Sequence, residues 1–351
     1  MKIAMIGQKG LPAQSGGVEK HVEEIGKRLV NAGYELTVFN RKHYSSIKDK
    51  SNHNGIVIKN LPSINTKHLD AITHTFCSTV YSMLSFIPRL LSHKKIVVTV
   101  HGLDWQRAKW GYLAKQILKL GEITSAFFPH KLIIVSNTLR NYYQEKYKID
   151  PVFIPNGVTL PTKISASEIK EKFGLQPQKY ILFLARLVPE KGAHYLLEAF
   201  SKIKTDLKLV IAGGSSNSDD YVLTLEKYKS FPNIIFTGQV SGNLLQELYS
   251  NAYIYVLPSD LEGLPISLLE AMSYQLPCLI SDIPENLEVG HDCSLTFRKA
   301  DSEDLAQKLI YAINNPEDLS RLAVKGFNKV KENYSWERVV QQTIAVYQSL
   351  L

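Results

Sequence analysis

Short runs of apolar, β-branched residues alternate along the chain with longer segments in which apolar residues recur every three or four positions. In the first part of the chain, the short runs predict strands at Lys2–Ile6, Leu36–Phe39, Ile96–Val100, Leu132–Val135 and Val152–Ile154. In the second part, they predict strands at Tyr180–Leu184, Leu207–Ala212, Ile234–Thr237, Ile254–Leu257 and Cys278–Ser281. The longer spacing predicts helices at Val18–Ala32, Ala193–Ile203, Leu244–Asn251, Ile266–Tyr274 and Ser302–Asn314. This alternation predicts parallel sheets with helices on both faces, an α/β fold.

The alternation is interrupted between Pro155 and Pro161, where two prolines and a glycine occur. A single sheet with this many strands would be unusual, so two doubly wound domains are the more economical interpretation. We predict a first domain at residues 1–160, a second at residues 161–335, and a C-terminal helix at residues 336–351 that packs back on the first domain. The apolar stretch Ala71–Leu91 is interrupted by Pro88, by Arg89 and by several histidine and serine residues. It therefore predicts an amphipathic helix and not a membrane span.

The charge is distributed unevenly over an otherwise ordinary globular composition of 44% hydrophobic and 21% charged residues, which excludes disorder and coiled coil. Residues 1–160 carry 22 lysines and arginines against 10 acidic residues, a net charge of +12, and residues 161–351 carry 19 against 23, a net charge of −4. A basic half can face nucleic acid, an anionic membrane or a phosphorylated substrate. Cys77, Cys278 and Cys293 form no CxxC pair, and the N-terminus lacks a signal-peptide pattern, so we expect a cytoplasmic protein.

A Gly-rich turn joins the first predicted strand to the first helix. Gly16 and Gly17 stand directly before the helix, where the backbone can approach an anion and the helix dipole favours phosphate. The spacing matches neither the dinucleotide fingerprint nor the P-loop. A flexible loop that uses glycine only to turn is the alternative.

Two cations, Arg186 and Lys191, straddle the turn after the predicted strand Tyr180–Leu184. Ligands of doubly wound sheets bind beyond the carboxyl ends of the strands. Arginine offers a planar fork for phosphate oxygens and lysine a compact charge, so together they could neutralise a diphosphate without a metal ion. Two solvated surface cations are the alternative.

Two glutamates lie eight residues apart further along, Glu262 in a loop and Glu270 in a helix that begins near Pro265. Glu262 could point at a sugar and Glu270 could accept hydrogen bonds from ribose hydroxyls. Backbone amides near the helix N-terminus could hold the phosphate, those of Gly263, Leu264 and Ile266. A loop carboxylate and a solvated helix residue are the alternative. This alternative is less favoured, because Glu270 falls in an apolar segment, where burying an unpaired carboxylate is costly.

These motifs match those of a known family. The chain resembles the retaining GT-B glycosyltransferases of family four over nearly its whole length, on Gly16-Gly17, His101-Gly102, Pro155-Asn156-Gly157-Val158, Arg186 with Lys191-Gly192, Gly213-Gly214 and Glu262 with Glu270. Residues 7–25 and Thr99–Gly111 are also similar to a subgroup often labelled rhamnosyltransferase. The resemblance implies two doubly wound Rossmann-like domains that face each other across a cleft, the first on the acceptor side and the second binding a nucleotide sugar.

The resemblance also implies roles for individual residues. Arg186 and Lys191 would bind the donor diphosphate, which Gly16 and Gly17 would approach from the opposite domain. Glu270 would bind the nucleotide ribose. The catalytic residues would be Glu262, which contacts the donor sugar, and His101 near the anomeric centre, for which a satisfied strand-end histidine is the alternative. The base would face Gly238, Gln239 and Val240. The acceptor side would be lined by Asp104, Trp105, Arg107, Lys109, Trp110 and Asn156.

The implied reaction moves a hexosyl group, with retention of configuration, from a nucleoside diphosphate sugar to a glycan or polyprenyl-diphosphate-linked acceptor in surface polysaccharide biosynthesis. A UDP- or dTDP-linked donor is favoured over a GDP-linked one. The sequence has no Asp-x-Asp motif for a chelated metal, and Asp219-Asp220 lies in a polar stretch, so we expect no metal and no cofactor. The basic half would dock to an anionic membrane face as a peripheral protein.

Three alternatives remain open. A GT-B-like nucleotide-sugar epimerase would isomerise the sugar without an acceptor. A nucleic-acid-binding protein would use the basic half, although the sequence contains no helix-turn-helix, RRM or zinc pattern. A carbohydrate-binding scaffold would have lost catalysis, which the intact set of Arg186, Lys191, Glu262 and Glu270 argues against.

Overall fold

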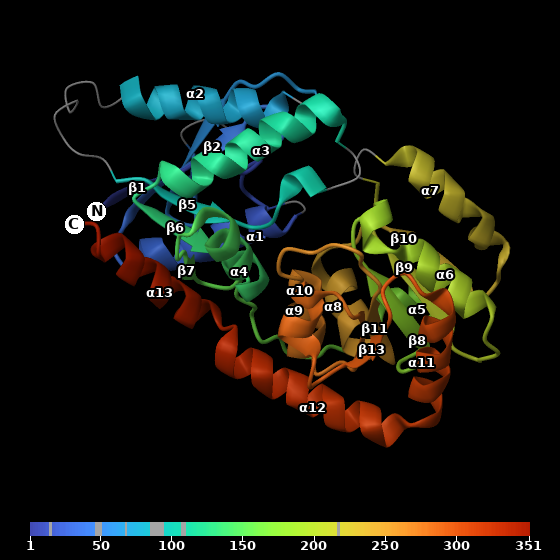
Figure 1. Ribbon diagram of the computed structural model, residues 1–351. Coiled ribbons are helices and arrows are strands. Elements are labelled where there is room, and N and C mark those ends of the chain that lie inside the picture. Colours follow the sequence, from blue (N-terminus) through green and yellow to red (C-terminus); the bar gives the residue numbers. More distant parts are fainter. Residues whose placement is uncertain (14–15, 46–50, 67–68, 85–94, 107–109, 216–217) are drawn as a thin grey trace. The chain divides into compact units, whose positions relative to one another are not determined.

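The computed structural model describes residues 1–13, 16–45, 51–66, 69–84, 95–106, 110–215 and 218–351. Strands and helices alternate along the chain, and nearly all strand pairs are parallel, as the hydrophobic pattern predicts (Figure 1). Of the strand pairs with an assigned register, only that of β3 with β4 is antiparallel. The α/β fold class predicted from the sequence is therefore confirmed.

The first part of the chain forms two small sheets. The first has the strand order β1-β2-β4-β3, with β1 at Lys2–Met5, β2 at Glu35–Arg41, β3 at Asn52–His53 and β4 at Ile56–Leu61. The second has the order β5-β6-β7, with β5 at Val97–Val100, β6 at Lys131–Ile134 and β7 at Val152–Phe153. The accompanying helices are α1 (Gly17–Asn31), α2 (Asp70–Leu84), η2 (Asp104–Gln106), α3 (Tyr112–Phe127) and α4 (Asn137–Tyr147).

The second part of the chain forms a sheet of six parallel strands in the order β10-β9-β8-β11-β12-β13. The strands are β8 (Tyr180–Leu184), β9 (Lys208–Ala212), β10 (Ile234–Gly238), β11 (Ile254–Leu257), β12 (Cys278–Ser281) and β13 (Leu295–Phe297). From β8 the chain adds strands in one direction, and from β11 it adds them in the other. The strand order therefore reverses between β8 and β11, and such a switch point is where open α/β sheets bind their ligands.

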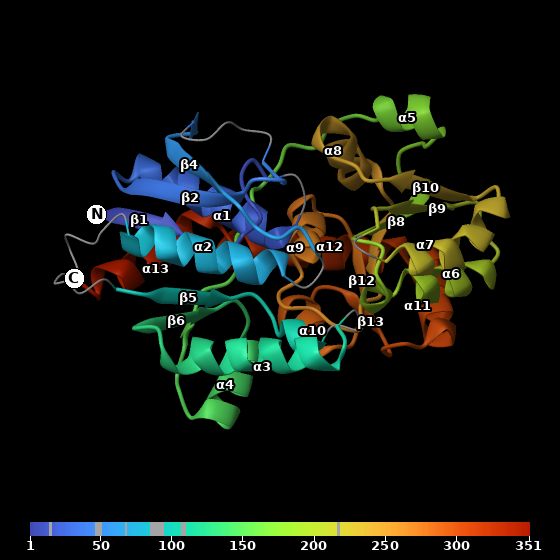
Figure 2. The same cartoon turned by 90° about the horizontal axis from the view of Figure 1, so that it is seen from above.

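Helices cover both faces of this six-stranded sheet. The helices in this part of the chain are α5 (Glu168–Phe173), η3 (Pro189–Lys191), α6 (Ala193–Ser201), α7 (Asp219–Glu226), η4 (Lys227–Ser230), α8 (Gly242–Asn251), α9 (Ile266–Ser273), α10 (Pro284–Gly290), α11 (Ser302–Asn314) and α12 (Pro316–Asn333). Viewed from above, α6 and α11 lie on one side of the sheet and α8 and α9 on the other (Figure 2).

The core beneath α6 and α11 is built from alternate side chains of the strands. Ile181 and Phe183 of β8 and Leu209 and Ile211 of β9 are fully buried there with leucines of both helices. Alternate side chains of a strand point to opposite faces of the sheet. Because both faces are covered by helices, every residue of β11 and β12 is buried, which explains their uninterrupted apolar sequences.

The chain divides by its internal contacts into two compact units. One unit comprises Met1–His101, Leu120–Ile133 and Trp336–Leu351, and the other comprises Gly102–Lys119 and Ile134–Ser335. The domain bounds expected from the sequence remain a prediction. Among the described residues, no helix combines the length and the apolar character that crossing a membrane requires.

The last helix, α13 (Trp336–Gln348), belongs to the first unit and lies against α1. The guanidinium of Arg28 on α1 donates a hydrogen bond of 3.1 Å to Glu337 and lies 6.0 Å from the ring centre of Trp336. Trp336 itself is 1% exposed. Burial of this ring anchors the end of the chain, because a large aromatic surface is removed from water.

Candidate functional site

The loop that follows β8 carries two cations, Arg186 and Lys191. At its start, the amide of Leu187 donates to the carbonyl of Gly214, in the loop after β9, at 2.9 Å. The short turn η3 then leads into Gly192, which has φ of +68° and precedes α6. Both cations therefore stand beyond the carboxyl end of β8.

The loop that follows β11 lies against the loop that follows β8. The amide of Asp260 donates to the carbonyl of Glu190 at 2.9 Å, and the hydroxyl of Tyr195 on α6 donates to Oδ2 of Asp260 at 3.1 Å. A Cβ on Gly192 would overlap the carbonyl oxygen of Pro258. Glycine is therefore required at this point, because any other residue would push the two loops apart.

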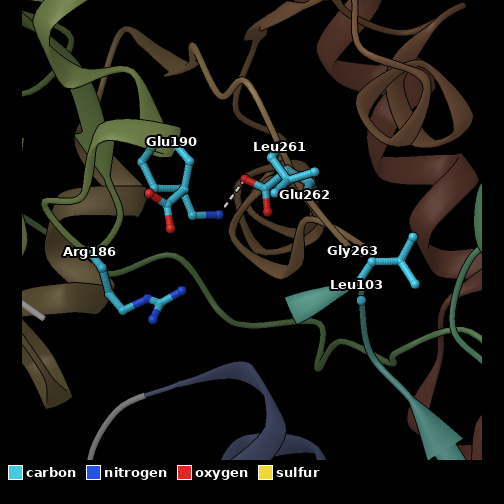
Figure 3. A pocket seen from close by; sticks show the side chains of 8 residues that line it. Leu103, Arg186, Glu190, Leu261, Glu262 and Gly263 are labelled. Carbon is cyan, nitrogen blue, oxygen red and sulfur yellow. Dashed lines mark hydrogen bonds and ion pairs between the residues drawn. The ribbon is translucent and has the colours of Figure 1, made fainter. Parts of the chain in front are cut away.

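Lys191 and Glu262 form an ion pair where these loops meet. Their Nζ and Oε1 atoms are 2.5 Å apart, and the dashed line in Figure 3 marks this contact. The hydroxyl of Ser259 donates to the same Oε1 at 2.7 Å. The side chains of Lys191 and Glu262 are only 15% and 7% exposed. Water therefore screens this pair much less than a surface ion pair.

A small pocket opens beside the ion pair. It is lined by Gly102, Leu103, Arg186, Glu190, Lys191, Leu261, Glu262 and Gly263. Figure 3 shows Arg186 and Glu190 on one side of this space, with Glu262 and Gly263 across from them. The structure therefore brings together Arg186, Lys191 and Glu262, three residues that lie up to 76 positions apart in the sequence.

Leu103 and Glu190 are lining residues for which the sequence assigns no role. The only signal for Glu190 is its place beside Lys191 in the segment Pro-Glu-Lys-Gly. Leu103 follows His101-Gly102, a motif of the resemblance, but nothing in the sequence connects it with the loop that carries Gly263. In the structure these two segments lie side by side, since a Cβ built onto Gly102 would be 3.7 Å from the Cα of Gly263.

The N-terminus of α9 adjoins the pocket through Gly263. The structure assigns no hydrogen-bond acceptor among the described residues to the amides of Gly263, Leu264 and Ile266. The amides of Leu268 and Leu269 donate to the carbonyl of Pro265, at 3.1 and 3.2 Å. Helix N-terminal amides and the helix dipole attract anions. The pocket thus combines two cations with a helix N-terminus.

Glu270 lies on α9, is half-buried and is not among the residues that line the pocket. Its Oε2 accepts a hydrogen bond of 3.2 Å from the hydroxyl of Tyr249, on α8. Burial, and then the nearby Glu270 carboxylate, raise the pKa of Tyr249 well above its usual value, so this hydroxyl stays protonated and donates. The carboxylate in an apolar segment thus has a polar partner, as the cost of burying it alone requires.

A further carboxyl group lies near Glu262. Glu285, on α10, is partly buried. Burial, and then the negative charges of Glu262 and Glu288, raise the pKa of Glu285. The negative charge of Glu262 therefore acts on Glu285 across to α10 and makes ionisation of the Glu285 carboxyl less favourable.

The predicted base-contact residues lie at the end of β10 and not in the pocket. Gly238 ends β10 with φ of +70° and accepts a hydrogen bond of 2.9 Å from the amide of Gly213. A Cβ on Gly214 would lie 3.7 Å from the Cβ of Gln239. Gly238 and Gln239 thus neighbour the Gly213-Gly214 turn, which follows β9, the strand next to β8 in the sheet.

The predicted acceptor-side residues are described in part, because Arg107 and Lys109 lie outside the described residues. Asp104 and Trp105 lie in η2, and Lys119 Nζ lies 5.0 Å from the ring centre of Trp105. Trp110 is half-buried. Asn156 is 2% exposed, and its buried Oδ1 accepts no hydrogen bond within the described chain.

In the first unit, Gly16 precedes α1 with φ of +103°, and Gly17 is the first residue of that helix. A buried carboxylate lies over this turn, since Glu19 Oε1 accepts a hydrogen bond of 3.0 Å from the amide of Lys9. Glycine is favoured at position 16, because other residues rarely adopt its positive φ. The roles expected for Gly16 and Gly17 remain predictions.

His101 directly follows β5 and belongs to an aromatic group in the first unit. Its ring centre lies 4.7 Å from that of His21 on α1, with the two ring planes 82° apart. His21 in turn lies 5.8 Å from the ring of Trp336. His21 is 8% exposed and is a neighbour of His101 that the sequence pattern does not reveal.

Metal-ligating side chains are dispersed over the described part of the chain, where no three His, Cys, Asp or Glu residues gather to hold an ion. Asp219 and Asp220 begin α7 and are exposed. The three cysteines are free thiols, and Cys278 and Cys293 are buried.

Two families match consecutive parts of the chain. Residues 15–160 match the family described as Glycosyltransferase Family 4, and residues 165–329 match the family described as Glycosyl transferases group 1. An uncharacterized glycosyltransferase of Methanocaldococcus jannaschii is 25% identical, over 99% of this chain and 98% of its own. The UDP-Gal:alpha-D-GlcNAc-diphosphoundecaprenol alpha-1,3-galactosyltransferase of Escherichia coli is 29% identical, over 61% of this chain and 58% of its own.

Solved structures share the fold. Sucrose-phosphate synthase from Thermosynechococcus elongatus superposes with a TM-score of 0.84 at 20% identity, over 99% of this chain and 98% of the other. The Anabaena protein HepE, in complex with UDP-glucose, superposes with a TM-score of 0.80 at 15% identity, over the full length of both chains. Residues 15–160 thus resemble glycosyltransferase family 4 and residues 165–329 resemble the glycosyl transferases of group 1, and the chain has the fold of the GT-B glycosyltransferases.

Proposed function

We propose that this glycosyltransferase moves a hexosyl group from a nucleoside diphosphate sugar to a hydroxyl of a glycan or lipid-linked glycan acceptor, in surface polysaccharide biosynthesis. The observation that carries the proposal is the pocket in which Arg186, Lys191 and Glu262 meet at the switch point of the six-stranded sheet. The E. coli relative, whose name gives a UDP-linked donor and a diphosphoundecaprenol-linked acceptor, supports it.

The donor diphosphate lies, in this proposal, against Arg186, Lys191 and the amides at the N-terminus of α9. The planar guanidinium binds two oxygens at once, and the ammonium adds a compact charge. Glu270 binds the ribose through its carboxylate, with Tyr249 holding one oxygen in place. Residues 238–240 receive the base. We favour UDP or dTDP over GDP as the nucleotide, and HepE bound to UDP-glucose is a relative in fold that supports uridine.

The proposed chemistry retains the anomeric configuration. The bond between the anomeric carbon and the diphosphate oxygen breaks, the acceptor oxygen bonds to the same face of that carbon, and its proton passes to the departing phosphate. Negative charge grows on the diphosphate in the transition state, where fixed cations and amides stabilise it most. Glu262 stabilises positive charge near the anomeric carbon and positions the sugar. His101, Gly16 and Gly17 act on the donor from the first domain.

We propose that transfer needs no metal ion. Arg186, Lys191 and the α9 amides supply the positive potential that a bound divalent cation supplies in other phosphate-transferring sites. Glu190 and Glu262 both line the pocket, but Glu262 already has Lys191 as its partner at 2.5 Å.

We further propose that the protein binds the anionic face of a membrane, where a polyprenyl-diphosphate-linked acceptor is presented. All residues of helix α3 are described, and Glu122, its one acidic residue, is the only one of them that is buried. Six large apolar residues of this helix are each 44–81% exposed, namely Tyr112, Leu113, Ile117, Leu120, Ile123 and Phe127. Its other charged residues are the lysines 115 and 119. An apolar helix face with basic charge and no exposed acid fits an anionic bilayer surface.

The experiment that tests the proposed reaction incubates the protein with UDP-, dTDP- and GDP-hexoses, with and without a polyprenyl-diphosphate-linked acceptor. We expect one donor to raise the melting temperature, because a ligand at about 100 times its Kd adds about 2.7 kcal/mol to the stability. We expect the same donor to release its nucleoside diphosphate only with the acceptor. Isomerisation of the sugar without an acceptor would instead identify an epimerase.

A further inference from the structure

A chain of buried hydrogen bonds leads from α10 to the carboxylate of Glu262. Asn286 Nδ2 donates to the hydroxyl of Ser281 at 2.9 Å, and that hydroxyl donates to the carbonyl of Ser259 at 2.5 Å. The hydroxyl of Ser259 then donates to Oε1 of Glu262 at 2.7 Å. Asn286, Ser281 and Ser259 are all fully buried. Buried polar groups that bond to one another in this way hold a defined geometry, because breaking any link leaves a polar group without water.

The two oxygens of Glu262 differ in their surroundings. Oε1 accepts from both Ser259 and Lys191, whereas the structure records no partner for Oε2 among the described residues. Because Glu262 lines the pocket, two donors on one oxygen leave the other oxygen for a ligand. Ser259 and Lys191 together therefore determine which way the carboxylate faces.

These two donors are not equivalent. Lys191 carries a charge that a diphosphate attracts, and its side chain can move along four rotatable bonds. Ser259 is neutral and has a single rotatable bond, and its backbone is held by Ser281 at the end of β12. When an anionic ligand attracts Lys191, Ser259 is the donor whose hold on Glu262 does not change.

We propose that Ser259 is a positioning residue, which keeps the Glu262 carboxylate directed into the pocket while Lys191 shares its charge with the bound donor. Ser281 and Asn286 support it by fixing the backbone of Ser259. This inference rests on the proposed function, in which Lys191 binds the diphosphate and Glu262 contacts the sugar. It concerns the step after donor binding, so it predicts an effect on turnover and not on donor affinity.

The test is steady-state transfer by Ser259→Ala in the full chain. We expect kcat to fall by about tenfold or more, the size of one hydrogen bond to a charged group, with the KM for the donor within twofold of the unchanged protein. A matched control is Ser294→Ala, since Ser294 is also buried but its hydroxyl bonds to no described residue. This control should keep normal turnover. A rise in donor KM with unchanged kcat would overturn the proposal.

A second comparison separates positioning from general stability. In a Glu262→Ala background, Ser259→Ala should cause no further loss of kcat, because the group it positions is gone. An equal further loss in that background would show that Ser259 acts without Glu262 and would overturn the inference. If Glu262→Ala alone leaves transfer normal, the proposed site itself is wrong, which is a distinguishable result.

A third variant covers the case in which Ser259→Ala does not fold. Ser281→Ala leaves the Ser259 hydroxyl in place and removes the bond that supports its backbone, together with an acceptor of Asn286. We expect a smaller fall in kcat in the same direction, again with an unchanged donor KM and again absent in the Glu262→Ala background. Normal kcat in a folded Ser281→Ala protein would overturn the supporting role of Ser281.

Discussion

Gly192 lies directly against the carbonyl group of Pro258, so closely that a Cβ on Gly192 would overlap the carbonyl oxygen. The contact joins the loop after β8 to the loop after β11. Lys191 stands one residue before Gly192, and Glu262 stands four residues after Pro258. The separation of these two backbones therefore sets the distance between the ammonium and the carboxylate.

Replacing this glycine should disturb the pair without touching either charged residue. Gly192→Ala should lower transfer by at least about tenfold and should lower the melting temperature, because the new methyl group forces the loops apart. A control for backbone strain alone is Gly174→Ala, since Gly174 has a similar φ of +59° and only a lysine tip at 3.7 Å nearby. That control should lose about 1–2 kcal/mol of stability but no specific activity. Equal activity losses in both variants would contradict the expectation.

Removing either member of the ion pair should be severe. Glu262→Ala and Lys191→Ala should each reduce kcat by about a hundredfold or more, which is the usual cost of losing one group that stabilises transition-state charge. Circular dichroism melts should show that both variants stay folded. Near-normal turnover by both variants would show that the chemistry takes place elsewhere.

The stability of the protein should depend on pH through Glu285. Its pKa is raised in the folded protein by burial and by Glu262 and Glu288. A carboxyl group with a raised folded-state pKa favours the folded protein below its unfolded pKa, and this contribution is lost as the pH rises through the folded value. Glu285→Gln should therefore raise the melting temperature at pH 7 and leave it unchanged near pH 4. A variant with the same effect at both pH values would point to packing instead.

Chelation should leave the reaction intact. Transfer measured after dialysis against EDTA should proceed at the rate seen with added magnesium, since the proposed charge stabilisation comes from Arg186, Lys191 and backbone amides. Activity that EDTA abolishes and magnesium restores would contradict this expectation.

Membrane binding should depend on α3. In flotation at low salt, the protein should rise with vesicles containing phosphatidylglycerol and stay behind with pure phosphatidylcholine. A double variant, Leu113→Ser with Leu120→Ser, should weaken binding, because it removes two large apolar side chains from the exposed face of α3. Leu223→Ser is a matched control, since Leu223 is 63% exposed on α7. Failure to float with the anionic vesicles would favour a soluble acceptor.

The hydrophobic pattern predicts the strands of the second part almost residue by residue. Tyr180–Leu184, Ile254–Leu257 and residues 278–280 are uninterrupted apolar runs, because helices cover both faces of this sheet. The pattern misses β4, in which Lys59 and Asn60 break the apolar run. It also misses β13, whose three residues are too few to show a period.

The candidate site also contains residues that the sequence predicts and residues that it does not. Arg186, Lys191 and Glu262 are recognisable because charged residues directly after buried strands stand out in a sequence. Ser259 and Glu190 are not recognisable, since a serine or glutamate in a loop has no distinctive spacing. The place of Glu190 in the pocket depends on Glu262, 72 residues further along, and the place of Ser259 depends on its bonds to Glu262 and to Ser281 at the end of the neighbouring strand, so both follow from the strand order of the folded sheet.

The ion pair of Lys191 and Glu262 also has a consequence for how the pocket receives an anion. An anion that enters meets a lysine that already has a carboxylate within 2.5 Å. It gains the attraction of Lys191 and Arg186 but also meets the repulsion of Glu262 and Glu190, so a single negative charge gains little. The preference of the pocket for one anion over another therefore depends on how near the ligand's negative groups come to Arg186 and Lys191 and how far they stay from the two carboxylates, so the placement of charge within a ligand matters more than its total.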